Sequence, residues 1–213
     1  TDGRWFALVN VWLFGCAGAA PEVGVTRAAL QHGDPDAAPE FAALPDVMQA
    51  QQSPRVQRGL SLAREVLQRG LPSPPDDRRY ANLQAWIDQS VAPWVEARRD
   101  SVDETRFQFA VETSAGQADS AAAESSIAWG VLALLEENTA HELSRIPSPA
   151  ELDTEPEIAE IFRELVTTQA KPFRSAALVK YRKCFDLGKR GGRDASAWTT
   201  FCGLRYERVR REL

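Results

Sequence analysis

Apolar residues recur at steps of three and four from Val56 almost to the end of the chain, and this spacing constrains the fold more than any other feature. The first such series is Val56, Leu60, Ala63 and Leu67. Steps of three and four place side chains on one face of an α-helix. Alternation with a period of two between turn residues, the pattern of a half-buried strand, is missing. The sequence therefore predicts an all-α fold.

Proline and glycine divide this region into several predicted helices. Ser53-Pro54 supplies an N-cap residue and a first-turn proline, and Gly70 and Pro72 end that helix. The other expected helices run from Asp76 with a kink or division at Pro93, over 102–111, from Ala121 to Ile146, from Glu155-Pro156 with a bend at Pro172 to a turn at 188–192, and from a cap at Asp194 through Arg211. Their short connections predict antiparallel neighbours, in a helical bundle or a short helical-repeat-like array.

The start of the chain has the pattern of an export signal. Arg4 precedes an apolar run, Trp5 to Phe14, that only Asn10 interrupts, and small residues follow it. A bilayer-spanning helix needs about 20 apolar residues, so this run is too short to cross as one. It fits the hydrophobic region of a signal peptide. The alternative is a buried N-terminal strand or helix.

Leu13-Phe14-Gly15-Cys16 resembles the lipobox of bacterial lipoproteins. The resemblance implies that Cys16 carries the lipid and becomes the mature N-terminus. Ala17 follows where an inner-membrane retention signal places Asp, so the same analogy implies an outer-membrane anchor facing the periplasm. The expected organisation is a signal at 1–15, a flexible tether rich in Pro, Gly and Ala at 16–52, and a helical domain at 53–213.

A second resemblance lies near the C-terminus. The spacing of Ala177, Leu178, Tyr181, Cys184 and Phe185 resembles the second helix of a tetratricopeptide repeat. The pattern does not recur one repeat length earlier, so it indicates a single repeat-like hairpin. Residues 146–213 as a whole are similar to C-terminal segments of helical-repeat lipoproteins of the Gram-negative envelope. That similarity implies adaptor or scaffold work on an envelope protein partner, without catalysis or cofactor.

Charge is distributed unevenly. From Lys171 to Leu213, twelve Lys and Arg side chains stand against four Asp and Glu, a net of +8, whereas the preceding residues carry thirteen against twenty-six, a net of −13. Such asymmetry is typical of an anion-facing end, here for an anionic envelope component, or of a solvated face that complements a helix dipole. Export and the negative total argue against nucleic acid as a partner. The candidate surface residues are Lys189, Arg190, Arg193, Arg208, Arg210 and Arg211.

With Cys16 lipidated, Cys184 and Cys202 are the remaining thiols in an oxidising compartment, where cysteines tend to pair. The Gly188–Gly192 turn folds their two helices into a hairpin and places both residues at similar distances from the turn. We therefore expect a Cys184–Cys202 disulfide. The alternative is two buried free thiols that act as small hydrophobes.

The sequence contains no assembled catalytic or metal motif. His141-Glu142 begins like a zinc-protease motif, but Arg145 takes the place of the second His. The basic turn at 188–192 lacks the Ser or Thr of a P-loop. Trp86, Trp94, Trp129 and Trp198 fall within helical patterns and are expected in the core, with a groove using Trp86 or Trp94 as the alternative.

Two functions therefore remain open. The first is a lipid-anchored periplasmic adaptor. The second is an envelope polysaccharide-acting enzyme that uses dispersed carboxylates. The enzyme requires two acidic side chains that converge in one water-excluded cleft with shifted pKa values, and the adaptor does not.

Overall fold

The computed structural model describes residues 53–110, 118–190 and 196–213. Within these ranges the chain is helical and contains no strand, which confirms the all-α prediction. The predicted signal, Cys16 and the tether lie outside the described residues. The α-helices are α1 (Pro54–Gln68), α2 (Tyr80–Trp86), α3 (Ala92–Ala110), α4 (Ala118–Ser144), α5 (Pro156–Gly188) and α6 (Ser196–Arg211). A π-helical segment (Ile87–Val91) joins α2 to α3, and a short 3-10 turn (Ala150–Leu152) precedes α5.

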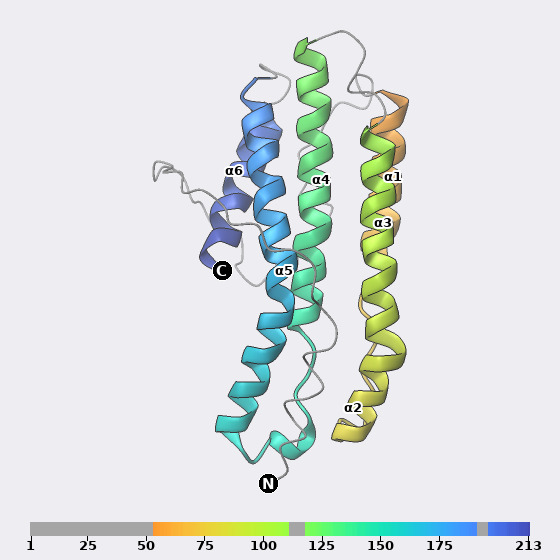
Figure 1. Cartoon of the computed structure of the whole chain (residues 1–213), viewed down its shortest axis with the longest axis vertical. Coiled ribbons are helices and arrows are strands. Elements are labelled where there is room, and N and C mark those ends of the chain that lie inside the picture. The colour runs from red at the N-terminus through yellow and green to blue at the C-terminus, as the bar shows by residue number, and fades with distance from the viewer. Residues whose placement is uncertain (1–52, 111–117, 191–195) are drawn as a thin grey trace.

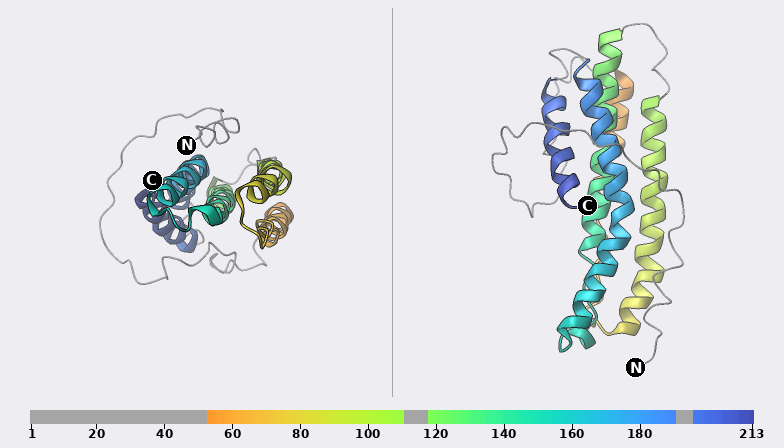
Figure 2. Two further views of the ribbon diagram at one scale, coloured as in Figure 1. Left: turned by 90° about the horizontal axis from the view of Figure 1, so that it is seen from below. Right: turned by 60° about the vertical axis from the view of Figure 1, so that its left-hand side comes forward.

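The helices form an elongated bundle in which α4 and α5, α5 and α6, and α1 and α3 run antiparallel, as expected (Figure 1). Helix α4 stands in the middle, with α1 and α3 on one side and α5 and α6 on the other, as the end view of Figure 2 shows. The central position follows from its composition, because consecutive side chains around the whole helix are buried. That run comprises Val131, Leu132, Ala133, Leu134 and Leu135.

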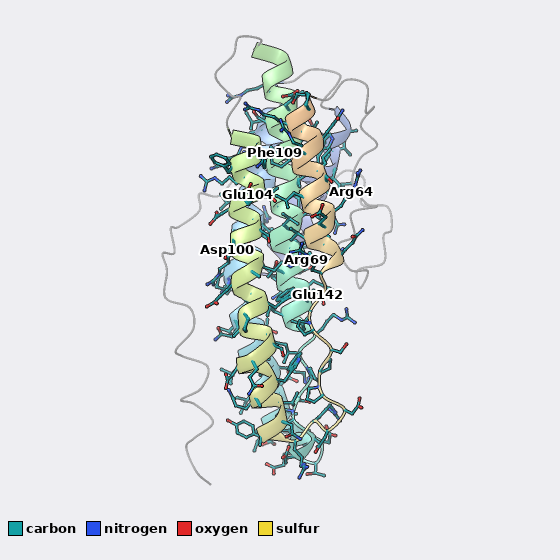
Figure 3. The ribbon with its side chains drawn as sticks, turned by 90° about the vertical axis from the view of Figure 1, so that its right-hand side faces the viewer. Arg64, Arg69, Asp100, Glu104, Phe109 and Glu142 are labelled. Atoms are coloured by element: carbon teal, nitrogen blue, oxygen red, sulfur yellow. A yellow bond between two sulfur atoms is a disulfide. The ribbon has the colours of Figure 1, made fainter. Side chains whose placement is uncertain are left out.

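Local chemistry explains where α1 begins and how closely it approaches α3. The Ser53 hydroxyl accepts a hydrogen bond from the Val56 amide at 3.4 Å, which confirms the predicted cap. Gly59 faces Phe109 of α3, and a Cβ added at Gly59 would lie 2.5 Å from the Phe109 ring. Figure 3 shows Phe109 on the side of α3 that faces α1. The absence of a side chain at Gly59 therefore allows the ring to pack against α1.

Of the two outcomes predicted at Pro93, a kink or a division of the helix, the division is wrong. Helix α3 continues from Ala92 through the expected separate stretch at 102–111 as far as Ala110, and the irregular turn is the π-helical segment just before it. Proline has no amide hydrogen to bond the carbonyl four residues earlier, and its ring crowds that carbonyl. Widening the preceding turn accommodates both effects without ending the helix.

The buried apolar side chains form two clusters along the bundle. One surrounds Cys184 and Cys202 and draws on α1, α3, α4, α5 and α6, and we call this end the disulfide half. The other draws on α2, α3, α4 and α5 together with the π-helical segment, and we call it the π-helix half. Figures 1 and 3 show α1 and α6 alongside the upper part of α4 and α5 only. The core of the π-helix half is Leu83, Trp86, Val91, Ala140, Leu143, Ala170 and Phe173.

No helix within the described ranges is both long enough and apolar enough to cross a membrane.

Candidate interaction surfaces

A buried carboxylate ties the central helix to α5 and α6. Glu137 of α4 is 4% exposed, and its Oε2 accepts a hydrogen bond from the Tyr181 hydroxyl at 2.6 Å. Its Oε1 lies 3.3 Å from Nη1 of Arg205 and 4.0 Å from Nε of Arg208. Burial raises the pKa of Tyr181 well above its usual value, so the hydroxyl stays protonated and donates. These contacts join α4 to α5 and α6, and they bind both carboxylate oxygens of Glu137 to other side chains of the protein.

A buried arginine of α3 joins the end of α1 to α4 through hydrogen bonds. Arg98 of α3 donates from Nη1 to the Val66 carbonyl and from Nη2 to Oδ1 of Asn138 at 2.8 Å. The Trp94 indole donates to the Arg69 carbonyl at 3.0 Å. The Val66 carbonyl also accepts a hydrogen bond from the Arg69 amide at 3.2 Å, so Arg98 and Trp94 add side-chain donors to the carbonyls at the end of α1. Burial lowers the pKa of Arg98 to about 10, so the side chain remains a cation at neutral pH and suits the negative end of the α1 dipole.

The tryptophans predicted for the core divide into two groups. Trp86 and Trp198 are buried, one in each half of the bundle. Trp94 and Trp129 are half-buried, and Lys183 lies over the Trp129 ring at 4.3 Å. The Trp86 or Trp94 groove therefore gains no support, because Trp86 packs in a core cluster and Trp94 binds the end of α1.

The residues that carry possible metal ligands do not converge. In the part of the chain that the structure describes, no group of three or more His, Cys, Asp or Glu side chains could hold a metal ion. His141 is half-buried on α4, and burial is the main cause that lowers its pKa. Glu142 beside it pairs with Arg145 at 3.7 Å, the position where a zinc-protease motif requires His.

The structure separates the candidate anion-binding residues. Lys189 and Arg190 are exposed at the end of α5, whereas Arg208, Arg210 and Arg211 lie in the last turn of α6. Helix α6 runs away from the end of α5 over 16 residues, which spans roughly 20 Å at the α-helical rise (Figure 1). Arg208 is also paired with Glu137 and Glu212. Arg193 lies outside the described residues, so the basic end is two separate groups.

Cys184 and Cys202 form the predicted disulfide. Their Cα atoms lie 6.1 Å apart, within the range that the bond requires, and both side chains are fully buried. The bond joins α5 to α6 beside Ser126 of α4, whose hydroxyl donates to the Cys184 carbonyl at 3.0 Å. It therefore lies where three helices meet, in a position that suits a structural crosslink.

The most prominent apolar surface runs along the outward side of α5. Ile158, Ile161 and Val179 are 42%, 47% and 46% exposed, and they account for half of the exposed large apolar side chains identified in the described ranges. Their spacing places them on one side of the helix, away from the buried series that contains Phe173 and Tyr181. We call this surface the outer face of α5. It comprises Ile158, Ile161, Leu165, Pro172, Ala176 and Val179.

The flanks of this outer face change sign along the helix. Exposed Glu157, Glu160 and Glu164 lie beside its first half, and exposed Lys171 lies beside its second half on the same flank. Contiguous apolar surface rimmed by charged residues is typical of a protein-binding site. The sequence contains a signal for this face, since Ile158, Ile161 and Leu165 follow one another at steps of three and four. The same helix also carries the buried series, and the spacing alone does not show which of the two series is covered.

No family model, curated protein or solved structure matches this chain in comparisons with known proteins.

Proposed function

We propose that this protein is a lipid-anchored adaptor of the bacterial envelope that binds a protein partner through the outer face of α5 and performs no catalysis. The observation that carries the proposal is the outer face itself, because an apolar strip along most of a long helix is costly to leave in water. A helix in a bundle is also a rigid platform, so the face meets a partner without an ordering cost.

The proposed location of the protein at a membrane of the envelope is supported by the start of the sequence. The lipobox-like Leu13-Phe14-Gly15-Cys16 supports lipid attachment at Cys16, and the following residues 17–52 would then separate the bundle from the membrane. Exposed Lys189 and Arg190 at the end of α5 supply a second contact for anionic envelope components. No observation on the described residues favours a polysaccharide-acting enzyme, because the buried carboxylate of Glu137 is held by Tyr181 and Arg205.

Site-specific photo-crosslinking in the source cells tests the binding role. A photoreactive amino acid at Ile161 should give a discrete crosslinked protein band, because Ile161, at 47%, is the most exposed large apolar side chain of the strip. The same amino acid at Glu65, an exposed position on α1, serves as the control. Absence of a band at Ile161, or an equal band at Glu65, would reject the outer face as the binding surface.

Metabolic labelling with a palmitate analogue tests the anchor separately. The wild-type protein should incorporate the label and Cys16→Ser should not, because the carry-over from lipoproteins makes that sulfur the acylated atom. Equal labelling of the two proteins would place the lipid elsewhere or remove it from the proposal. The outer face of α5 would be unaffected by that result.

A further inference from the structure

The outer face of α5 is self-complementary, and we propose that its occupant is the same face of a second copy of this chain. Two α5 helices would lie antiparallel around a twofold axis. The inference rests on the proposed function only in taking the outer face as the docking surface. It adds the identity of the partner and the geometry of the pair.

The apolar residues of the face are arranged symmetrically about its centre. The midpoint of the strip falls between Thr168 and Gln169. Three apolar pairs stand at equal distances on either side of that midpoint. An antiparallel pair with its twofold axis at the midpoint therefore places an apolar side chain opposite an apolar side chain at every level. The facing pairs would be Ile158 with Val179, Ile161 with Ala176, and Leu165 with Pro172.

The members of each facing pair are offset around the helix in the manner that packing requires. Ile158 and Ala176 lie toward one edge of the strip, and Ile161 and Val179 lie toward the other, at 100° per residue. At a given level, the side chain from one copy thus lies beside the side chain from the other. Two strips of this kind interdigitate, as ridges do in grooves between packed helices.

Charges on the flanks obey the same symmetry. Glu164 and Lys171, both exposed, lie on the same flank of the strip. In the antiparallel pair, Glu164 of one copy lies within about 3 Å, along the helix axis, of the level of the other copy's Lys171, by the helical rise. In a parallel pair this flank would face the opposite flank of the partner, which carries Phe162, Val166 and Gln169, so the Glu164–Lys171 contacts form only in the antiparallel orientation.

The expected dimer is weak. The strip from Ile158 to Val179 extends over roughly 32 Å and is one helix wide. Stable interfaces usually bury about 800 Å² on each partner, and a single pair of helix faces lies at the low end of that scale. Dimer formation should therefore depend on protein concentration, and flank charges should have a measurable influence on it.

Thiol crosslinking at the midpoint tests the geometry directly. In the full chain carrying Cys16→Ser, the native Cys184 and Cys202 are buried in their disulfide, so an introduced cysteine is the accessible thiol. Thr168→Cys places a thiol beside the proposed axis and should give a covalent dimer with a short bis-maleimide. Thr167→Cys is the matched control, because this neighbouring threonine is also exposed but points away from the strip. No dimer from Thr168→Cys, or as much from Thr167→Cys, would overturn the inference.

A charge-swap series tests which residues meet. Glu164→Lys and Lys171→Glu should each weaken self-association about tenfold in sedimentation measurements, because each turns two attractive contacts of the symmetric pair into repulsive ones. The double variant should recover the wild-type affinity, and so should an equimolar mixture of the two single variants, since their mixed pair restores both contacts. Failure of the double variant and the mixture to recover would exclude this antiparallel arrangement.

These measurements separate the dimer from the proposed function. A wild-type chain that remains monomeric, together with an Ile161 crosslink to a different protein in cells, would reject the second copy and leave the adaptor role intact. An Ile161 crosslink at the mass of two copies would support both. A monomeric chain without any Ile161 crosslink would reject both.

Discussion

The two halves of this bundle differ in how their helices are held. In the disulfide half, five helices surround the core, and a disulfide joins two of them. Close packing adds to this, because a Cβ at Gly130 would lie 2.7 Å from the Trp198 ring and one at Gly188 would lie 2.2 Å from Oγ1 of Thr199. In the π-helix half, neither α1 nor α6 is present, and the chain passes through an irregular turn.

This difference leaves α5 firmly held along one part of its length and exposed along its outer face. Helix α5 runs through both halves, and in the disulfide half it is fixed to α4 and α6 by Tyr181 and Cys184. In the π-helix half it packs through Ala170 and Phe173 on one side. The disulfide half therefore acts as a clamp, and α5 projects from it with its outer face exposed.

The largest expected effect comes from removing the centre of the clamp. Trp198→Ala should lower the free energy of unfolding by about 3–5 kcal/mol, because Trp198 is 1% exposed and its loss leaves a cavity. Urea unfolding followed by circular dichroism measures the change. Trp129→Ala, at a half-buried tryptophan on α4, is the comparison and should cost clearly less. Equal losses at the two tryptophans would contradict the role assigned to Trp198.

Removal of the disulfide should have the next largest effect. The double variant Cys184→Ala/Cys202→Ala should lose about 3 kcal/mol, since a crosslink that closes a loop of 18 residues restricts the unfolded chain by that amount. Hydrogen exchange adds the location: amides of α6 should lose protection more than amides of α2. A uniform loss along the chain would mean that the two halves unfold together and that the clamp is not a separate unit.

The Glu137 contact should contribute less. Tyr181→Phe keeps the shape of the buried ring and removes the hydroxyl that donates to Glu137 at 2.6 Å. Because Arg205 still pairs with the carboxylate, we expect a loss of about 1.5–3 kcal/mol, the usual range for a hydrogen bond to a charged group. Thermal unfolding of the variant and wild type at one pH gives the number. An unchanged midpoint would show that a water or another donor replaces the hydroxyl.

Local signals made the starts of α1 and α5 predictable, whereas α2 begins at Tyr80 and not at the predicted Asp76. Ser53-Pro54 and Glu155-Pro156 mark the starts of α1 and α5, because capping and a first-turn proline act within a few residues. The disulfide was also predictable, since two cysteines on either side of one turn have few other partners. The effect of Pro93 was not, because the chain can absorb a missing amide by ending a helix or by widening a turn, and the surrounding packing selects between these.

The candidate surface was only partly predictable, for a similar reason. The steps from Ile158 to Ile161 and Leu165 are visible in the sequence, but which of the two apolar series of α5 is covered depends on where α4 and α6 lie. For the basic residues, the sequence indicated one group and the fold separates it into two. Lys189 and Arg211 both belong to the basic stretch 171–213, but Lys189 lies at the end of α5 and Arg211 at the far end of α6. A net charge counted over the sequence does not contain this separation.

The smallest expected effect is a pH dependence that belongs to the π-helix half. His141 lies on α4 beside Ala140 of that cluster, and it is the one histidine among the described residues. Burial is the main cause that lowers its pKa below the usual 6.5, Arg145 and Arg208 lower it further, and Glu142 and Glu137 oppose them. The folded chain therefore binds a proton at this site less readily than the unfolded chain does.

A lowered folded-state pKa fixes the direction of this dependence. The contribution of neutral His141 is complete above pH 6.5 and is lost as the pH falls from there toward the lowered pKa. Unfolding of wild type and His141→Gln should be compared from pH 7.5 to 5, because the carboxylates of both proteins titrate alike and cancel in the difference. The wild type should lose stability relative to the variant as the pH falls. If the two curves stay parallel, His141 is solvated in both states and the π-helix half has no proton-linked weakness there.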